Sequence, residues 1–266
     1  MSTTLELSTA RARQHAASNK PSGMPDVEWR TRVDTAACYR LMALYRMTDL
    51  ANGFIGARVP EADDQFLLAR YGEFNEEITA SSLHNLPISR WPGAERGTDM
   101  NAAAVSMIQT TLKARPDVTC VLHAHTKSTM LLASLETELL PISQAAVMFK
   151  GLWGFSEFEF YCGDEFCKQL LEDLGDLPVL LMRNHGMFIA AKSVPDAFFM
   201  AFYLNQACDL QVGCMQTGAK IHIPADRKTD AWHAGYHDNP WWEYDGSREW
   251  PALLRKLGRE MPGYDR

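Results

Sequence analysis

The chain has 266 residues, of which 46% are hydrophobic and 22% are charged. A chain of this length can bury a substantial core, so we expect one large domain or at most two small ones. Its formal net charge of −7 argues against a nucleic-acid backbone or an anionic membrane as the main partner, because both select a basic protein face.

The first 25 residues are expected to form a flexible tail, because they are rich in Ser, Thr, Ala, Gly and Pro. They contain no apolar segment after a basic cluster, which argues against a secretory signal. No stretch of the sequence approaches the ~20 apolar residues that span a bilayer. Six scattered cysteines lack zinc-ribbon spacing, and reduced thiols in the cytoplasm are expected. The cysteines are Cys38, Cys120, Cys162, Cys167, Cys208 and Cys214.

Residues 26–50 repeat apolar side chains at helical spacing, and Asp26 is placed to cap that helix. Two short apolar runs, 54–59 and 65–69, flank the turn-like "PEADD" and predict a β-hairpin. A helix is expected over 101–114, with Asn101 as its cap.

The second half alternates strand and helix patterns with no linker, which predicts a single α/β unit. The expected strands are 118–125, 156–161 and two within 178–191, and the expected helices are 127–135, 163–176 and 193–218. Ser193 lies three residues before Asp196, a variant of the capping box. We therefore expect a main domain over 26–222. An aromatic, irregular arm over 223–266, ending in a short helix, is expected to pack on this domain or on a neighbouring subunit.

The segment "VTCVLHAHTKS" places His123 and His125 one residue apart at the end of an apolar strand. Alternate residues of a strand project to the same side, about 7 Å apart along the backbone, so both imidazoles can reach one metal ion. His185, in "LLMRNHGMFIA", is the best third ligand, because it lies on a turn where Gly186 permits a positive φ and close backbone approach. Three histidines leave a coordination position open, as catalytic metal sites do.

At these residues the chain resembles the class II aldolase and adducin family, through "RPDVTCVLHAHT", "LLMRNHGMFIA" and the loop "YGEFNEEITASSL". The resemblance implies a three-layer α/β/α fold around a mainly antiparallel sheet, assembled as a homotetramer. It also implies that His123, His125 and His185 hold a divalent metal, Zn2+ or Fe2+, which stabilises an enediolate when a C–C bond breaks.

The sequence departs from the sugar-phosphate aldolases of that family at two places. Their Ser-Ser-Glu run, which supplies the acid/base, corresponds to Ala102, Ala103 and Ala104, and an asparagine that holds phosphate corresponds to Phe54. We therefore expect Phe54, Ala103 and Ala104 to contact a non-phosphorylated substrate with apolar or aromatic character. A replacement acid/base is expected among acidic residues near this site: Glu73, Glu76 and Glu77 in the loop "YGEFNEEIT" and Asp99 before the next helix are the candidates, of which Glu73, Glu77 and Asp99 are favoured.

The favoured hypothesis is a metal-dependent lyase that cleaves or decarboxylates a small, aromatic hydroxy- or oxo-acid. One alternative is a non-heme Fe(II) oxygenase that decarboxylates an aromatic acid oxidatively, as relatives in aminocoumarin pathways are thought to do. Iron oxygenases more often use two histidines and a carboxylate, which counts against it. The other alternative is a non-catalytic, adducin-like scaffold, against which the retention of all three histidines argues.

Overall fold

The computed structural model describes residues 19–89, 99–159, 162–237 and 245–266. Its strands are β1 Phe54–Arg58, β2 Gln65–Leu68, β3 His84–Pro87, β4 Cys120–Ala124, β5 Trp153–Ser156, β6 Val179–Met182 and β7 Gly186–Ala191. Its helices are α2 Asp26–Leu44, α3 Ala102–Ala114, α4 Lys127–Ala133, α5 Gln144–Val147, α6 Asp164–Leu174, α7 Val194–Gln216, α8 Asp226–His237 and α9 Trp250–Glu260.

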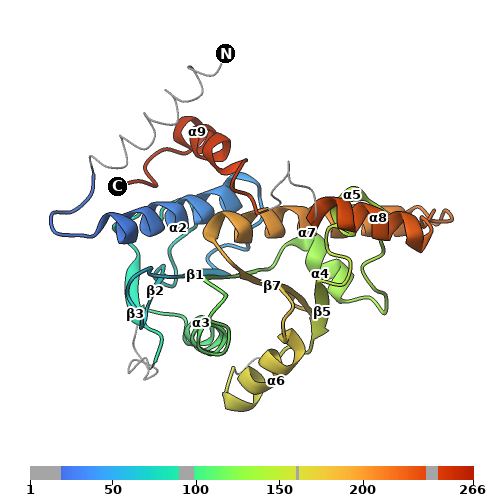
Figure 1. The fold of residues 1–266 in the computed structure, drawn as a ribbon, viewed down its shortest axis with the longest axis horizontal. Helices are drawn as coiled ribbons and strands as arrows, with labels where there is room; N and C mark the ends of the chain where they lie inside the picture. The colour runs from blue at the N-terminus through green and yellow to red at the C-terminus, as the bar shows by residue number, and fades with distance from the viewer. Residues whose placement is uncertain (1–18, 90–98, 160–161, 238–244) are drawn as a thin grey trace.

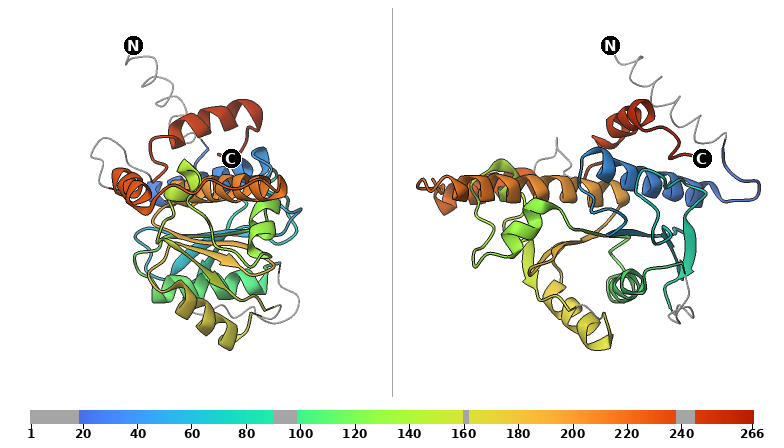
Figure 2. Two further views of the ribbon diagram at one scale, coloured as in Figure 1. Left: turned by 90° about the vertical axis from the view of Figure 1, so that its right-hand side faces the viewer. Right: turned by 180° about the vertical axis from the view of Figure 1, so that it is seen from behind.

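A seven-stranded sheet forms the middle of the molecule, in the order β3-β2-β1-β4-β7-β6-β5. Every neighbouring pair is antiparallel except β5 and β6. Helices α2 and α7 cover one face of the sheet, and α3 and α6 lie against the other (Figure 1; Figure 2). The expected three-layer α/β/α fold around a mainly antiparallel sheet is therefore confirmed.

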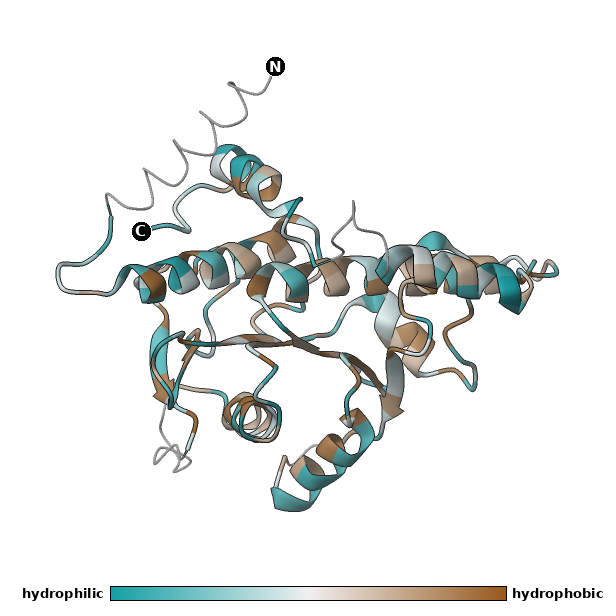
Figure 3. Ribbon diagram, in the orientation of Figure 1, coloured by the Kyte–Doolittle hydropathy of each residue, from teal (hydrophilic) through white to brown (hydrophobic). Residues whose placement is uncertain are grey.

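Both faces of the sheet are buried, so its central strands β4 and β7 are apolar except at His123 of β4 (Figure 3). In β4, Leu122 packs into the larger cluster beneath α2 and α7, whereas Val121 packs into the smaller cluster with α3 and α6. The alternation of β4 directs His123 to the second face, beside Phe54 of the neighbouring strand β1. The metal candidates thus lie where β4 leaves the core.

The carboxy-terminal residues pack against the domain. Helix α9 lies on α2 (Figure 1). Trp250 is buried in the larger cluster, and its indole Nε1 donates a hydrogen bond to Asp34 Oδ1 at 2.8 Å. Tyr264 is also buried in this cluster. Residues 238–244 of the expected arm lie outside the described residues, as do residues 1–18 of the expected tail.

Several expected element boundaries were wrong. The first helix ends at Leu44 and not near residue 50, because Arg46 adopts a left-handed φ of 57° and the chain turns back, with Met47 N donating to Met42 O. Asp26 does not cap this helix; Pro25 holds the cap position and Asp26 is the first helical residue. The caps by Asn101 and Ser193 are confirmed by side-chain hydrogen bonds to backbone N–H groups.

The strand expected over 156–161 is also misplaced. The structure has β5 at Trp153–Ser156, paired in parallel with β6, and residues 157–159 lie outside any strand. Residues 160–161 lie outside the described part. Three elements were not expected: β3, α5 and α8, the last within a region expected to be largely irregular. Among the described residues, no helix has the length and apolar character needed to cross a membrane.

Candidate metal centre

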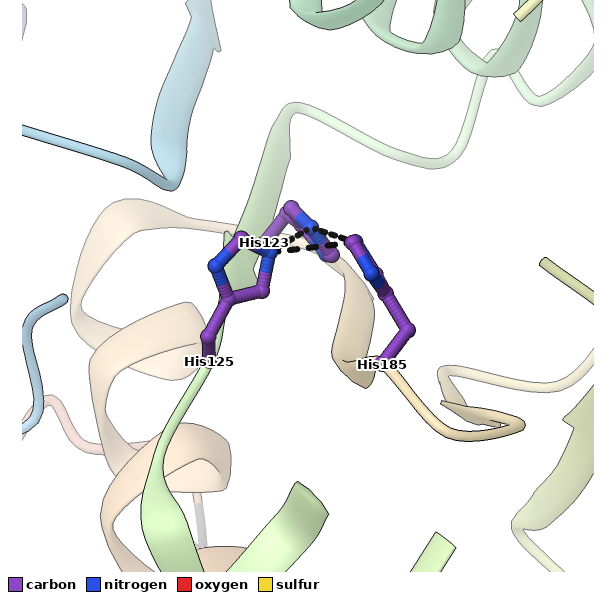
Figure 4. A group of neighbouring side chains, drawn as sticks. All are labelled: His123, His125 and His185. Atoms are coloured by element: carbon purple, nitrogen blue, oxygen red, sulfur yellow. Dashed lines mark hydrogen bonds between the residues drawn. The ribbon is translucent and has the colours of Figure 1, made fainter. Parts of the chain in front are cut away.

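Three imidazoles meet at one point beside the sheet (Figure 4). The Nε2 atom of His123 lies 2.8 Å from that of His125 and 3.0 Å from that of His185, and the last two are 3.0 Å apart. His123 belongs to β4, His125 follows the end of that strand, and His185 lies on the turn from β6 to β7. The pair and the third histidine expected from the sequence are thus brought together.

The close approach of β7 to β4 brings His185 to the other two rings. A Cβ atom on Gly186 would lie only 2.5 Å from the carbonyl oxygen of Ala124 and 3.1 Å from His125 Cδ2. Glycine is therefore required here for the close contact. The expectation of a positive φ at Gly186 was wrong: the left-handed residue of this turn is Asn184, with φ of 55°.

A second glycine allows the chain before β1 to approach the same strand. Gly53 has a φ of +89°, and a Cβ atom there would lie 2.8 Å from the carbonyl oxygen of His123. Both the backbone angle and the contact exclude a side chain at this position. The approach places Phe54 next to His123, with ring centroids 5.2 Å apart.

Contacts behind two of the rings determine which nitrogen carries the proton. His123 Nδ1 lies 2.8 Å from the carbonyl oxygen of Met187, and His125 Nδ1 lies 3.2 Å from Asp49 Oδ2. Both partners are acceptors, so each Nδ1 is the donor, and in the neutral form of each ring Nε2 then carries a lone pair. Such outer contacts are typical of histidines that bind metal.

Two of the three rings, His123 and His185, resist protonation. Burial, followed by the neighbouring His125 and His185, holds the pKa of His123 well below its usual range. Burial and the neighbouring His125 lower the pKa of His185 to about 4. Near neutral pH these two rings are therefore neutral and available as ligands.

The three converging Nε2 atoms are suited to bind a divalent transition metal, and they are too close together for three unprotonated nitrogens without a cation between them. Lone pairs of His123 and His125 that face each other at 2.8 Å have no proton to share, so a cation between them would relieve the repulsion. Two nitrogens bound to one tetrahedral zinc ion are separated by roughly 3.3 Å, given Zn–N bonds of about 2.0 Å. The observed separations are somewhat shorter, and the donor set suits Zn2+ or Fe2+.

Aromatic rings enclose two sides of the cluster. Phe158 stacks on His185 with ring centroids 3.6 Å apart, and Phe54 flanks His123. These rings limit the access of water to the histidines.

A small pocket lies beside Phe54. It is lined by Tyr39, Ala51, Gly53, Phe54, Leu68, Ala69, Arg70, Glu73, Asn75, Ile78, Asn101 and Ala104. A second, smaller pocket shares Tyr39, Gly53, Phe54 and Asn75 with it and includes His123. Of the residues expected to contact the substrate, Phe54 and Ala104 line the larger pocket and Ala103 does not.

The acidic candidates have different surroundings, and Glu76 is exposed and does not line the larger pocket. Glu73 lines the larger pocket, and its Oε2 atom is buried without a hydrogen-bond partner in the described structure. Glu77 instead accepts a hydrogen bond from the backbone N–H of Phe74 at 2.9 Å. Asp99 is exposed and lies 3.6 Å from Arg70 Nε. Only Glu73 combines a position in the pocket with an unpaired carboxylate oxygen.

Sequence reasoning missed Asp49 and Asn75. Asp49 belongs to the connection between α2 and β1, and nothing in its local pattern indicates that it will meet His125, 76 residues later. Asn75 lines both pockets, but a polar residue in an acidic loop has no distinctive signal. Contacts of this kind depend on the fold and not on local spacing.

Comparisons with known proteins agree with this arrangement. Residues 33–212 match the family model described as the class II aldolase and adducin N-terminal domain. A Pseudomonas aeruginosa protein with the provisional name of a class 2 aldolase is 37% identical over 241 residues, which cover 89% of this chain and 92% of that protein. Rat beta-adducin is 29% identical over 242 residues, 85% of this chain but only 33% of the adducin.

A solved structure of a related protein has the same fold. The crystal structure of an aldolase II superfamily protein from Pseudomonas syringae superposes with a TM-score of 0.83 at 31% sequence identity. The match covers 92% of this chain and 98% of that one.

Proposed function

Because the chain belongs to the class II aldolase and adducin family, we propose that it is a metal-dependent lyase. Its substrate is a small, non-phosphorylated hydroxy- or oxo-acid with an aromatic group, in which it breaks a C–C bond by retro-aldol cleavage or decarboxylation. The observation that carries the proposal is the convergence of three Nε2 atoms within 3.0 Å of one another, near a pocket that contains an unpaired carboxylate.

His123, His125 and His185 would hold the cation, Zn2+ or Fe2+, in this proposal. When bound, such an ion acts as a Lewis acid that polarises a carbonyl or hydroxyl group and stabilises the negative charge that develops on oxygen as the C–C bond breaks. The protein's part is to keep His123 and His185 neutral through burial, and to orient two of the rings through Met187 O behind His123 and Asp49 behind His125.

Glu73 is the residue we assign to proton transfer. In a retro-aldol cleavage a base removes the hydroxyl proton, the O–H electrons form the carbonyl of one product, and the C–C electrons pass to the other product as an enolate. Glu73 would accept that hydroxyl proton and return it to the carbon of the enolate, which leaves its carboxylate unchanged at the end of the cycle. Its free Oε2 atom is suited to this task because no other group occupies it.

The walls of the pocket support an acid with an apolar group. Phe54, Leu68 and Ile78 line the pocket, and each 10 Å² of apolar ligand area buried against them would contribute about 0.25 kcal/mol. Arg70 and Asn75 offer N–H donors that can pair with a carboxylate. An acid with an apolar group therefore matches both kinds of side chain in the pocket.

The test uses metal-loaded protein and a panel of aryl and alkyl hydroxy- and oxo-acids, with release of a carbonyl product or of carbon dioxide as the readout. Glu73→Gln should lower kcat by about 10² to 10⁴-fold, the range that acid/base groups contribute, while metal content stays equal to that of the wild type. Glu76→Gln, an exposed substitution in the same loop, is the matched control. Equal loss in both variants, or no loss in Glu73→Gln, would remove Glu73 from the mechanism.

A scaffold function is the second candidate, favoured by the similarity to beta-adducin over 85% of this chain. It predicts a purified protein whose stability and partner binding do not depend on metal.

Measurement of oxygen uptake during the same substrate screen separates the lyase from an Fe(II) oxygenase, because a lyase consumes no oxygen.

A further inference from the structure

We propose that Arg40 is a positioning residue, which together with residues 262–266 holds the loop between β2 and β3 in the shape that presents Glu73 to the pocket. The inference rests on the proposed function, since it concerns the group assigned to proton transfer there. It identifies the part of the chain, distant in sequence from the histidines, on which that group depends.

Arg40 connects three carbonyl groups from two separate segments. Its Nε donates to Ile78 O at 2.7 Å, its Nη2 to Glu77 O at 3.3 Å, and its Nη1 to Pro262 O at 2.6 Å. The residue is only 7% exposed. Burial of a guanidinium is costly unless its donors are hydrogen-bonded. The three carbonyl contacts are therefore needed for Arg40 to be buried in this position.

The carboxy-terminal segment continues the same attachment. Ala80 N donates to Tyr264 O at 2.8 Å, and Ser81 donates to Arg266 O through both its backbone N and its Oγ, each at 2.8 Å. Tyr264 is buried in the larger core cluster, which fixes this segment to the domain. The second half of the loop is therefore held between α2 and residues 262–266.

A short series of contacts leads from Arg40 to Glu73. Ile78, whose carbonyl binds Arg40, also lines the pocket that Glu73 lines. Glu77, the other loop residue bound by Arg40, is tied to Phe74 twice: its N–H donates to Phe74 O, and its carboxylate accepts from Phe74 N, both at 2.9 Å. Phe74 is the direct neighbour of Glu73. The turn over residues 74–77 thus connects Glu73 to the second half of the loop, which Arg40 and residues 262–266 hold in place.

Apart from this turn, the first half of the loop is attached by a backbone hydrogen bond from Tyr71 N to Asp99 O at 2.8 Å, two residues before Glu73. Tyr71 and Phe74 are 54% and 43% exposed, and the ion pair between Arg70 and Asp99 is long and exposed. Exposed ion pairs contribute about 0–1 kcal/mol. Loss of the Arg40 contacts should therefore release Glu73 without moving the histidines, which lie on other elements.

The experiment compares Arg40→Met and Arg40→Lys with Arg30→Met, an exposed substitution on the same helix. Methionine keeps the length of the side chain without its donors, and lysine cannot reproduce the planar fork that reaches three carbonyls. A fourth variant, lacking Asp265 and Arg266, removes the acceptor of Ser81 and serves if Arg40→Met does not fold. For each protein we measure metal content, hydrogen exchange, kcat and KM.

We expect amide exchange over residues 70–83 to be at least about tenfold faster in Arg40→Met. Metal content and the exchange of segments 118–126 and 182–188 should be unchanged. We expect kcat to fall by about 10²-fold, the effect of a catalytic group misplaced by about 1 Å, with KM little changed and Arg40→Lys intermediate. Unchanged loop exchange, or faster exchange with the kcat of Arg30→Met, would overturn the proposal. Absence of turnover in the wild-type protein itself would instead refute the proposed function.

Discussion

Substitution of Asp49 tests whether the contacts behind the histidines tune metal binding. Asp49 Oδ2 accepts a hydrogen bond from His125 Nδ1 at 3.2 Å, with the Asp49 side chain 44% exposed and that of His125 16% exposed. Loss of a carboxylate behind a metal-binding histidine weakens binding by 10 to 100-fold. Because the hydrogen bond is long and the carboxylate is nearly half exposed to water, we expect the lower end of that range. Zinc binding should weaken by about tenfold, or about 1.4 kcal/mol.

The assay is a competition titration of zinc against a chromogenic chelator, with Asp49→Ala and Asp49→Asn measured beside Asp63→Ala. Asp63 is exposed in the turn after β1 and serves as the control. We expect Asp49→Asn to fall between the wild type and Asp49→Ala, because an amide oxygen still accepts the hydrogen bond but carries no charge. If Asp49→Ala binds zinc as tightly as Asp63→Ala, the contact does not orient a ligand and the reasoning fails.

Three further predictions concern packing, pH and assembly. In Gly186→Ala the new Cβ would lie 2.5 Å from Ala124 O, so the free energy of unfolding measured in denaturant should fall by about 1–3 kcal/mol and zinc binding should weaken. Gly213→Ala, with open space around its Cβ, should reduce neither stability nor zinc binding. Apo-protein should lose thermal stability as pH falls from about 6.5 towards the pKa of about 4 for His185, because the unfolded chain takes up protons that the folded site refuses; a Tm that falls no more steeply than in His185→Gln would contradict this. The molar mass from light scattering should be a multiple of the 29.9 kDa chain mass, four times that mass in a homotetramer. A monomer with full activity would exclude that assembly.

The elements that the sequence predicts well are those with strong local signals. The hairpin of β1 and β2, the β6–β7 pair and the caps at Asn101 and Ser193 all follow from short patterns of apolar, turn and capping residues. The convergence of the three histidines was predictable for a related reason: two share one strand end, and the third lies on a tight turn between strands.

The parts that could not be predicted depend on distant contacts. Strand β3, "HNLP", is short, polar and ends in proline, and it exists because it pairs with β2 at the sheet edge. The true position of β5 is set by its parallel pairing with β6. Asp49 and Arg40 carry no local mark of their roles, since each is defined by a partner from another part of the chain.

Metal analysis of the histidine variants tests the central claim most directly. Apo-protein titrated with zinc should bind one equivalent per chain. His123→Ala, His125→Ala and His185→Ala should each lose most of that binding while retaining the far-ultraviolet circular dichroism of the wild type, because the loss of one ligand leaves the ion poorly held and the fold intact. Stoichiometric zinc in His185→Ala would contradict the account, since the three rings would then not act as one site.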